Sequence, residues 1–65
     1  MNTAMMVLGE KKITAITKAL KEYGYSTITE NDVQVQATAA LDGKPVDVGP
    51  GMMIRSILKD EGWIK

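Results

Sequence analysis

The side chains best suited to contact nucleic acid are those of Arg55, Ser56 and Lys59. Guanidinium, hydroxyl and ammonium groups contact phosphates and base edges in nucleic-acid complexes. Arg55 and Lys59 share one face of a helix, one turn apart, if this stretch is helical. The simpler alternative is that all three residues form only the solvated face of an amphipathic helix. Lys11 and Lys12 are two further cations that could contact phosphate.

Catalytic and metal-binding chemistry is restricted by composition, because the chain contains neither Cys nor His. Disulfides, the usual zinc sites and histidine acid–base catalysis are therefore excluded. Gly49, Pro50 and Gly51 could cradle an anion before a helix, but the lysine of a phosphate-binding loop is missing. A turn that leads into a helix explains them better. We expect a non-enzymatic binding protein without a cofactor or a metal.

Two methionine pairs, Met5-Met6 and Met52-Met53, are a second candidate site. Methionine is adaptable and frequent at permissive binding surfaces. The pairs could form an apolar surface that binds another protein or a second copy of the chain. They could equally be core filler.

The pattern near the end of the chain predicts a helix over residues 51–61. Pro50 suits the first helical position, and Gly62 suits the position just past the last one. Leu58 should contact the aromatic residue that follows Gly62. That residue, Trp63, is the only tryptophan in a chain without Phe, and we expect it to be the largest buried apolar anchor.

The first half of the chain predicts a helix over residues 10–23, with Ile13, Ile16, Leu20 and Tyr23 on one face. Gly24 should end it, with Tyr25 and Leu20 in the positions that Trp63 and Leu58 hold in the last helix. Gly9 interrupts the helical pattern. Residues 1–8 are therefore expected to form an arm or a first helical turn.

The middle of the chain allows two structures. Thr29 and Asp32 have the spacing of a helix capping box, and Ile28 and Val33 that of a hydrophobic staple. This pattern favours a helix over residues 30–42 that stops at Gly43. The alternative is a β-hairpin near residues 33–48, since apolar residues alternate there and Asp42-Gly43 is a turn signal.

These elements predict one all-α domain over residues 1–65 with three helices, and the alternative is an α+β fold with the hairpin. Eight Lys and Arg balance eight Asp and Glu, which argues against a strongly basic nucleic-acid module but not against a local basic patch. The apolar run at residues 4–8 is too short for a membrane span. We expect a cytoplasmic protein that does not bind membranes. Its short length favours a homodimer.

The segment Ile54–Ile64 resembles the helix and Gly-Trp ending of small helix-turn-helix and winged-helix-like segments in phage-type replication and regulatory proteins. The chain departs from that group in its neutral charge and in lacking a two-stranded wing after Trp63. The resemblance implies a small accessory protein of phage or mobile-element type. The sequence thus favours a DNA-binding or DNA-associated regulator, and the alternative is a protein-interaction module with a Met-rich surface.

Overall fold

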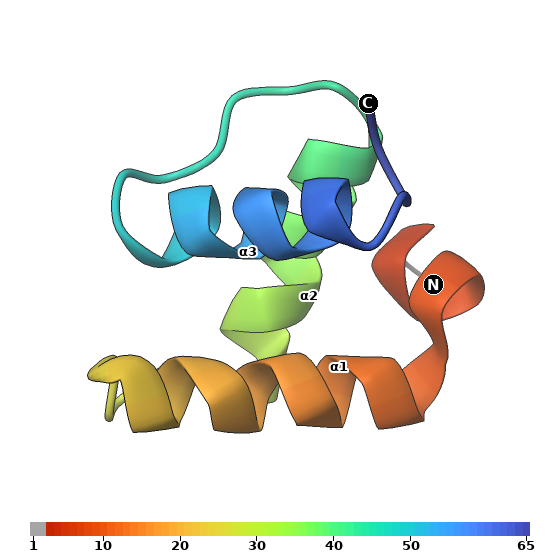
Figure 1. Cartoon of the computed structure of the whole chain (residues 1–65). Helices are drawn as coiled ribbons and strands as arrows, with labels where there is room; N and C mark the ends of the chain where they lie inside the picture. Colours follow the sequence, from red (N-terminus) through yellow and green to blue (C-terminus); the bar gives the residue numbers. More distant parts are fainter. Residues whose placement is uncertain (1–2) are drawn as a thin grey trace.

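Three helices form the fold in the computed structural model, which describes residues 3–65. They are α1 (Thr3–Tyr23), α2 (Glu30–Leu41) and α3 (Pro50–Asp60). Helix α2 packs against both of the others, and Figure 1 shows α2 and α3 on the same side of α1. The all-α prediction is confirmed. The β-hairpin alternative is wrong, because residues 33–41 are helical and the described chain contains no strand.

Helix α2 begins with the predicted capping box. The backbone N–H of Asp32 donates to Thr29 Oγ1 at 3.1 Å, and the backbone N–H of Thr29 donates to Asp32 Oδ2 at 3.0 Å. Two N–H groups that would otherwise lack a partner are thereby satisfied. Ile28 and Val33, the predicted staple, are both buried. This local signal explains why the segment is a helix despite its alternating pattern.

Helix α1 starts earlier than predicted and consists of two helical parts joined at Gly9. Gly9 has φ 84° and ψ 164°, which are not helical angles, and the chain bends sharply there (Figure 1). The first part packs onto the domain: Ala4 is fully buried, and its N–H donates to Thr38 Oγ1 of α2 at 3.0 Å. Residues 3–8 therefore form helical structure rather than a free arm. Residues 1 and 2 of the expected arm lie outside the described residues.

All three helices end in the same hydrogen-bonded turn. A glycine N–H donates to the carbonyl three residues back, and the next N–H donates to the carbonyl five residues back. These N–O distances are 3.2 and 3.0 Å at Gly24, 3.2 and 2.8 Å at Gly43, and 3.1 and 2.8 Å at Gly62. Each glycine has positive φ, where a side chain would be strained. The predicted helix stops are confirmed.

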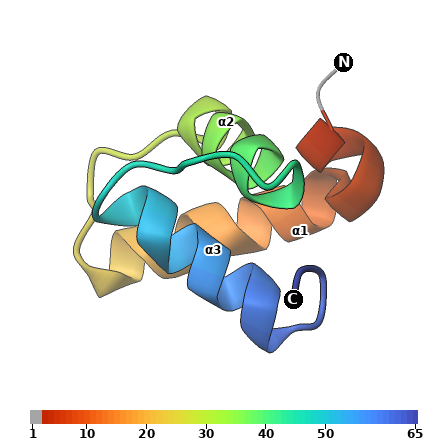
Figure 2. The same ribbon diagram turned by 90° about the horizontal axis from the view of Figure 1, so that it is seen from above.

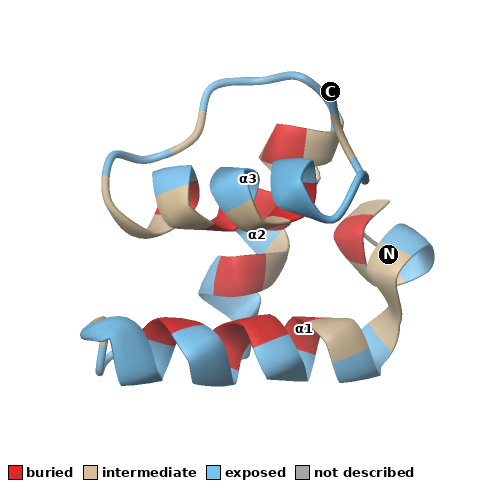
Figure 3. Cartoon of the chain, viewed as in Figure 1, coloured by how far each residue is buried: buried red, intermediate tan, exposed pale blue. Residues whose placement is uncertain are grey.

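The core is aliphatic, and all of its residues except Ile28 lie on the inner faces of the three helices (Figure 3). Ile28 comes from the connection between α1 and α2. Leu20 and Leu58 are fully buried, as predicted, and Tyr25 is half-buried. The buried cluster consists of Ala4, Ile13, Ile16, Leu20, Ile28, Val33, Ala37, Ala40, Ile54 and Leu58.

Two aromatic predictions are wrong. Trp63 is 41% exposed and is not the main buried anchor, because Ile13, Leu20, Ile54 and Leu58 fill the centre instead. Tyr23 is 68% exposed and lies outside the apolar stripe of α1. Its ring stacks on Tyr25 with the centroids 6.0 Å apart. Aliphatic side chains suffice for so small a core, and the aromatic rings lie at its edge.

Beyond its helix-ending turn, the connection from α2 to α3, residues 42–49, is held to α2 by a pair of side-chain hydrogen bonds. Gln36 Nε2 donates to Asp47 Oδ2, and the backbone N–H of Asp47 donates to Gln36 Oε1, both at 2.9 Å. The N–H of Met52 donates to the Asp47 carbonyl at 3.0 Å and so ties the start of α3 to the same point. The connection is longer than the turn of about three or four residues in a helix-turn-helix motif.

Candidate nucleic-acid interface

The residues that the sequence proposed for DNA contact lie on two helices. Arg55, Ser56 and Lys59 are all exposed on α3, and Lys11 is exposed on α1. Lys12 is already engaged, because its Nζ lies 2.6 Å from Glu61 Oε1. Lys12 is therefore poorly placed to bind phosphate. Within residues 3–65, two surface clefts lie near the helix ends, and of these five residues only Arg55 lines one of them.

A cleft of about 630 Å³ opens where the ends of α2 and α3 approach each other. All of its ionisable side chains are cationic: Lys44, Arg55 and Lys65. No ion pair within residues 3–65 engages these three cations. We call this site the basic cleft, and its lining comprises Ala40, Leu41, Gly43, Lys44, Pro45, Arg55, Trp63, Ile64 and Lys65.

The helix-ending turns position two of these residues. Gly43 ends α2 and Gly62 ends α3, and the residue after each glycine, Lys44 or Trp63, lies in the basic cleft. Arg55 comes from the exposed side of α3. Local backbone geometry thus places Lys44 and Trp63 just past two helix ends, and the packing of α2 against α3 brings them together with Arg55.

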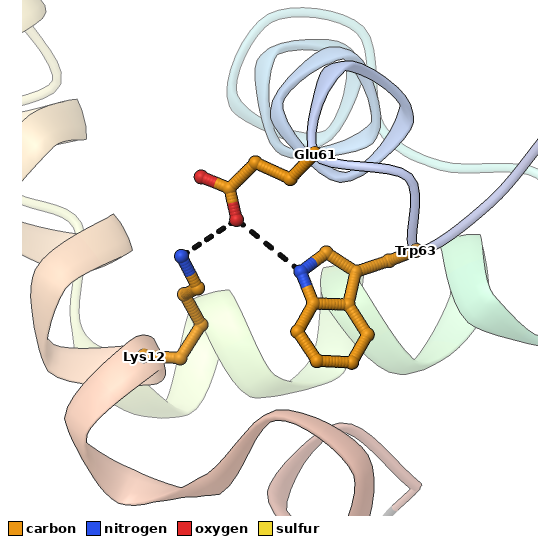
Figure 4. Close-up of polar contacts among 3 residues, drawn as sticks. All are labelled: Lys12, Glu61 and Trp63. Carbon is orange, nitrogen blue, oxygen red and sulfur yellow. Dashed lines mark hydrogen bonds and ion pairs between the residues drawn. The ribbon is translucent and has the colours of Figure 1, made fainter.

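The indole of Trp63 is held by a short chain of polar contacts (Figure 4). Its Nε1–H donates to Glu61 Oε1 at 3.2 Å, and the same oxygen pairs with Lys12 Nζ. The contact with Lys12 lowers the pKa of Glu61 most, and the hydrogen bond from Trp63 lowers it further. Glu61 is therefore an ionised acceptor near neutral pH. Its negative charge is offset by Lys12 beside it.

A second cleft, of about 450 Å³, lies near the start of α2 and has the opposite charge. Asp32 and Asp47 are its acidic side chains, and Tyr25 and Val35 contribute apolar surface. We call it the acidic cleft. Both carboxylates serve the fold, since Asp32 caps α2 and Asp47 binds Gln36. The acidic cleft is explained by these structural roles.

The methionine pairs do not form one surface. Met5 and Met53 pack against the core, whereas Met6 and Met52 are exposed. The N-terminal part of α1 and the start of α3 lie at opposite ends of the molecule (Figures 1 and 2). An apolar docking surface built from both pairs is therefore disfavoured. The homodimer stays a prediction.

Sequence reasoning did not identify Lys44, Lys65 or Trp63 as contact residues. The available signal was the repeated helix stop: a glycine followed by Tyr25, Lys44 or Trp63 occurs at the end of each helix. Lys44 is the one cation in this set. Its proximity to Arg55 follows only from the packing of α2 against α3.

Other kinds of site find no support within residues 3–65. No helix there is both long enough and apolar enough to cross a membrane. No group of three or more potential metal-ligating side chains occurs in the same range. In comparisons with known proteins, no family model, curated protein or solved structure matches the chain.

Proposed function

We propose that the chain is a small DNA-binding protein that contacts phosphates through the basic cleft and the adjoining exposed face of α3. The observation that supports this proposal is the set of cations in the cleft, Lys44, Arg55 and Lys65, with no Asp or Glu among the described lining residues. Unpaired cations in a concave site attract phosphate and release its counterions on binding.

The charge of the whole chain does not oppose this proposal. Its net charge is zero, yet the acidic residues of the acidic cleft and the cations of the basic cleft lie in separate sites. Binding depends on this local potential, which is screened beyond about 10 Å at 0.1 M salt. We therefore expect weak binding at physiological salt and stronger binding at low salt.

The competing explanation is that the cations only stabilise helix ends. Lys44 follows the C-terminus of α2, and a cation is favourable beside the partial negative charge of such an end by about 0.3–1 kcal/mol. This role predicts a change in stability without a change in DNA affinity. Melting temperature and affinity must therefore be measured on the same variants.

The test is fluorescence anisotropy of a labelled oligonucleotide titrated with protein at several salt concentrations. Three phosphate contacts predict a slope of log K against log salt of roughly −2 to −3. Arg55→Gln should weaken binding and make this slope shallower by roughly 1. Lys18→Gln, on the exposed side of α1, removes the same charge outside the basic cleft and should have little effect. Equal losses in both variants, or no binding at low salt, would reject the proposal.

A further inference from the structure

We propose that the basic cleft takes single-stranded nucleic acid, with one base stacked on Trp63 and its flanking phosphates against Lys44, Arg55 and Lys65. This inference rests on the proposed function and specifies its ligand. The observation behind it is the position of an aromatic ring among the cations of a single cleft. Aromatic platforms combined with a positively charged groove are the general means of binding single strands.

The exposure of Trp63 is the first argument. Its side chain is 41% exposed, whereas the large aliphatic side chains at the centre of the core, such as Leu20, Ile54 and Leu58, are fully buried. A half-exposed indole keeps apolar surface in water, and a stacked base would remove that surface. Every base has a flat apolar face, so such stacking needs no particular sequence.

The contacts that restrain the indole also favour stacking. The bond from Nε1 to Glu61 at 3.2 Å and the pairing of Glu61 with Lys12 at 2.6 Å restrain the indole (Figure 4). A ring that is already restrained loses less conformational freedom when a ligand binds. The carboxylate that holds it is charge-compensated by Lys12, so its repulsion of a nearby phosphate is reduced.

The size of the cleft and the exposed indole in its lining favour a single strand over a duplex. Its volume of about 630 Å³ lies within the usual range for pockets of small ligands, about 300–1000 Å³. A nucleotide can enter such a site, whereas duplex bases are stacked on each other and hide their faces. Leu41, Pro45 and Ile64 supply apolar lining near the indole.

The experiment uses the fluorescence of Trp63, the only tryptophan in the chain. The protein is titrated at low salt with oligo-dT, with oligo-rU and with a blunt-ended DNA duplex of equal length. We expect single strands to quench the emission and to shield the indole from acrylamide. The duplex should do neither at the same concentration. The dT and rU arms show whether a 2′-hydroxyl is preferred.

Variants separate stacking from charge. Trp63→Leu should weaken the binding of labelled oligo-dT by about 5- to 150-fold, the loss of one stacked base, and leave a salt-dependent remainder. Trp63→Phe should retain most of the affinity, because it keeps an aromatic face. Circular dichroism melts establish that both variants are folded.

Three results would overturn one or both proposals. If the duplex binds as tightly as the single strand and Trp63→Leu changes nothing, the stacking inference fails while DNA binding stands. If no nucleic acid binds at low salt, both fail. If single strands bind without changing the emission or acrylamide access of the wild-type protein, Trp63 is not the platform, whatever its variants do.

Discussion

Replacing Gly51 with alanine tests the packing at the start of α3 directly. Gly51 is buried in the first turn of that helix, and its φ is not positive, so alanine meets no backbone strain. An added Cβ would lie 2.6 Å from Gln36 Oε1, 3.0 Å from Val46 Cβ and 3.2 Å from the Val46 carbonyl carbon. Gln36 can move aside, but the Val46 backbone belongs to a connection that is held in place by Asp47.

The magnitude follows from three contributions. Overpacking against Val46 costs about 1–3 kcal/mol. Displacing Gln36 disturbs its two 2.9 Å hydrogen bonds with Asp47, each worth about 0.5–1.5 kcal/mol. Alanine recovers about 0.5–1 kcal/mol through its higher helix propensity. We expect a net loss of about 1–5 kcal/mol, which lowers Tm by roughly 4–8 °C for each kcal/mol.

The assay is thermal and urea unfolding followed by circular dichroism. Ser56→Ala is the matched control, because it places alanine at an exposed position of the same helix and should leave Tm unchanged or slightly higher. Gln36→Ala should cost less in the Gly51→Ala background than in the wild type, since the two residues compete for the same space. A Gly51→Ala protein that melts at or above the wild-type temperature would refute the close approach of Gln36 and Val46.

Three further predictions concern the core, the N-terminal segment and pH. Leu58→Ala should lower the free energy of unfolding by about 2–5 kcal/mol, and Trp63→Leu should lower it clearly less, because only Leu58 is fully buried. Urea unfolding that gives the reverse order would contradict this ranking. Thr38→Val removes the acceptor of the Ala4 N–H and should cost about 1 kcal/mol, with faster amide exchange confined to the first turns of α1; unchanged exchange would show that the contact is unimportant. Because Lys12 and the indole lower the pKa of Glu61 from 4.5, the stability from this pair is complete above pH 4.5 and is lost as pH falls through the lowered pKa. Trp63 emission should titrate below pH 4.5, and a midpoint above that value would show that the contacts do not favour the carboxylate.

Local signals allowed much of the fold to be predicted from sequence. The capping box at Thr29 and Asp32 decided between helix and hairpin, because two reciprocal side-chain bonds outweigh an alternating pattern in the residues that follow. Asp42-Gly43 was ambiguous by itself, since a glycine with positive φ can close a hairpin or end a helix. The break at Gly9 was also visible in sequence.

Tertiary features were not predictable in the same way. Helices α1 and α3 both end in a glycine followed by an aromatic residue, yet Tyr25 is half-buried and Trp63 is exposed. The burial of each ring depends on which other element packs beside it. The hydrogen bond from the Ala4 N–H to Thr38 joins residues that are distant in sequence. The pairing of Lys12 with Glu61 likewise joins α1 to the end of α3.

The candidate site was predictable only in part. Arg55 was chosen for its chemistry and lies in the basic cleft, whereas Lys59 and Lys11 do not line it. Lys44 and Lys65 lie just beyond helices and carry no periodic pattern that would connect them with Arg55. Only the packing of α2 against α3 brings Lys44 together with Arg55 and Lys65.

An NMR titration of the isotope-labelled protein with a short single-stranded oligonucleotide at low salt tests the central claim most directly. If the basic cleft is the binding site, the amide signals of Lys44 and Arg55 and the indole N–H signal of Trp63 should shift together and return when salt is raised. Shifts confined to the exposed side of α1, around Lys18, or no shifts at all, would contradict the account.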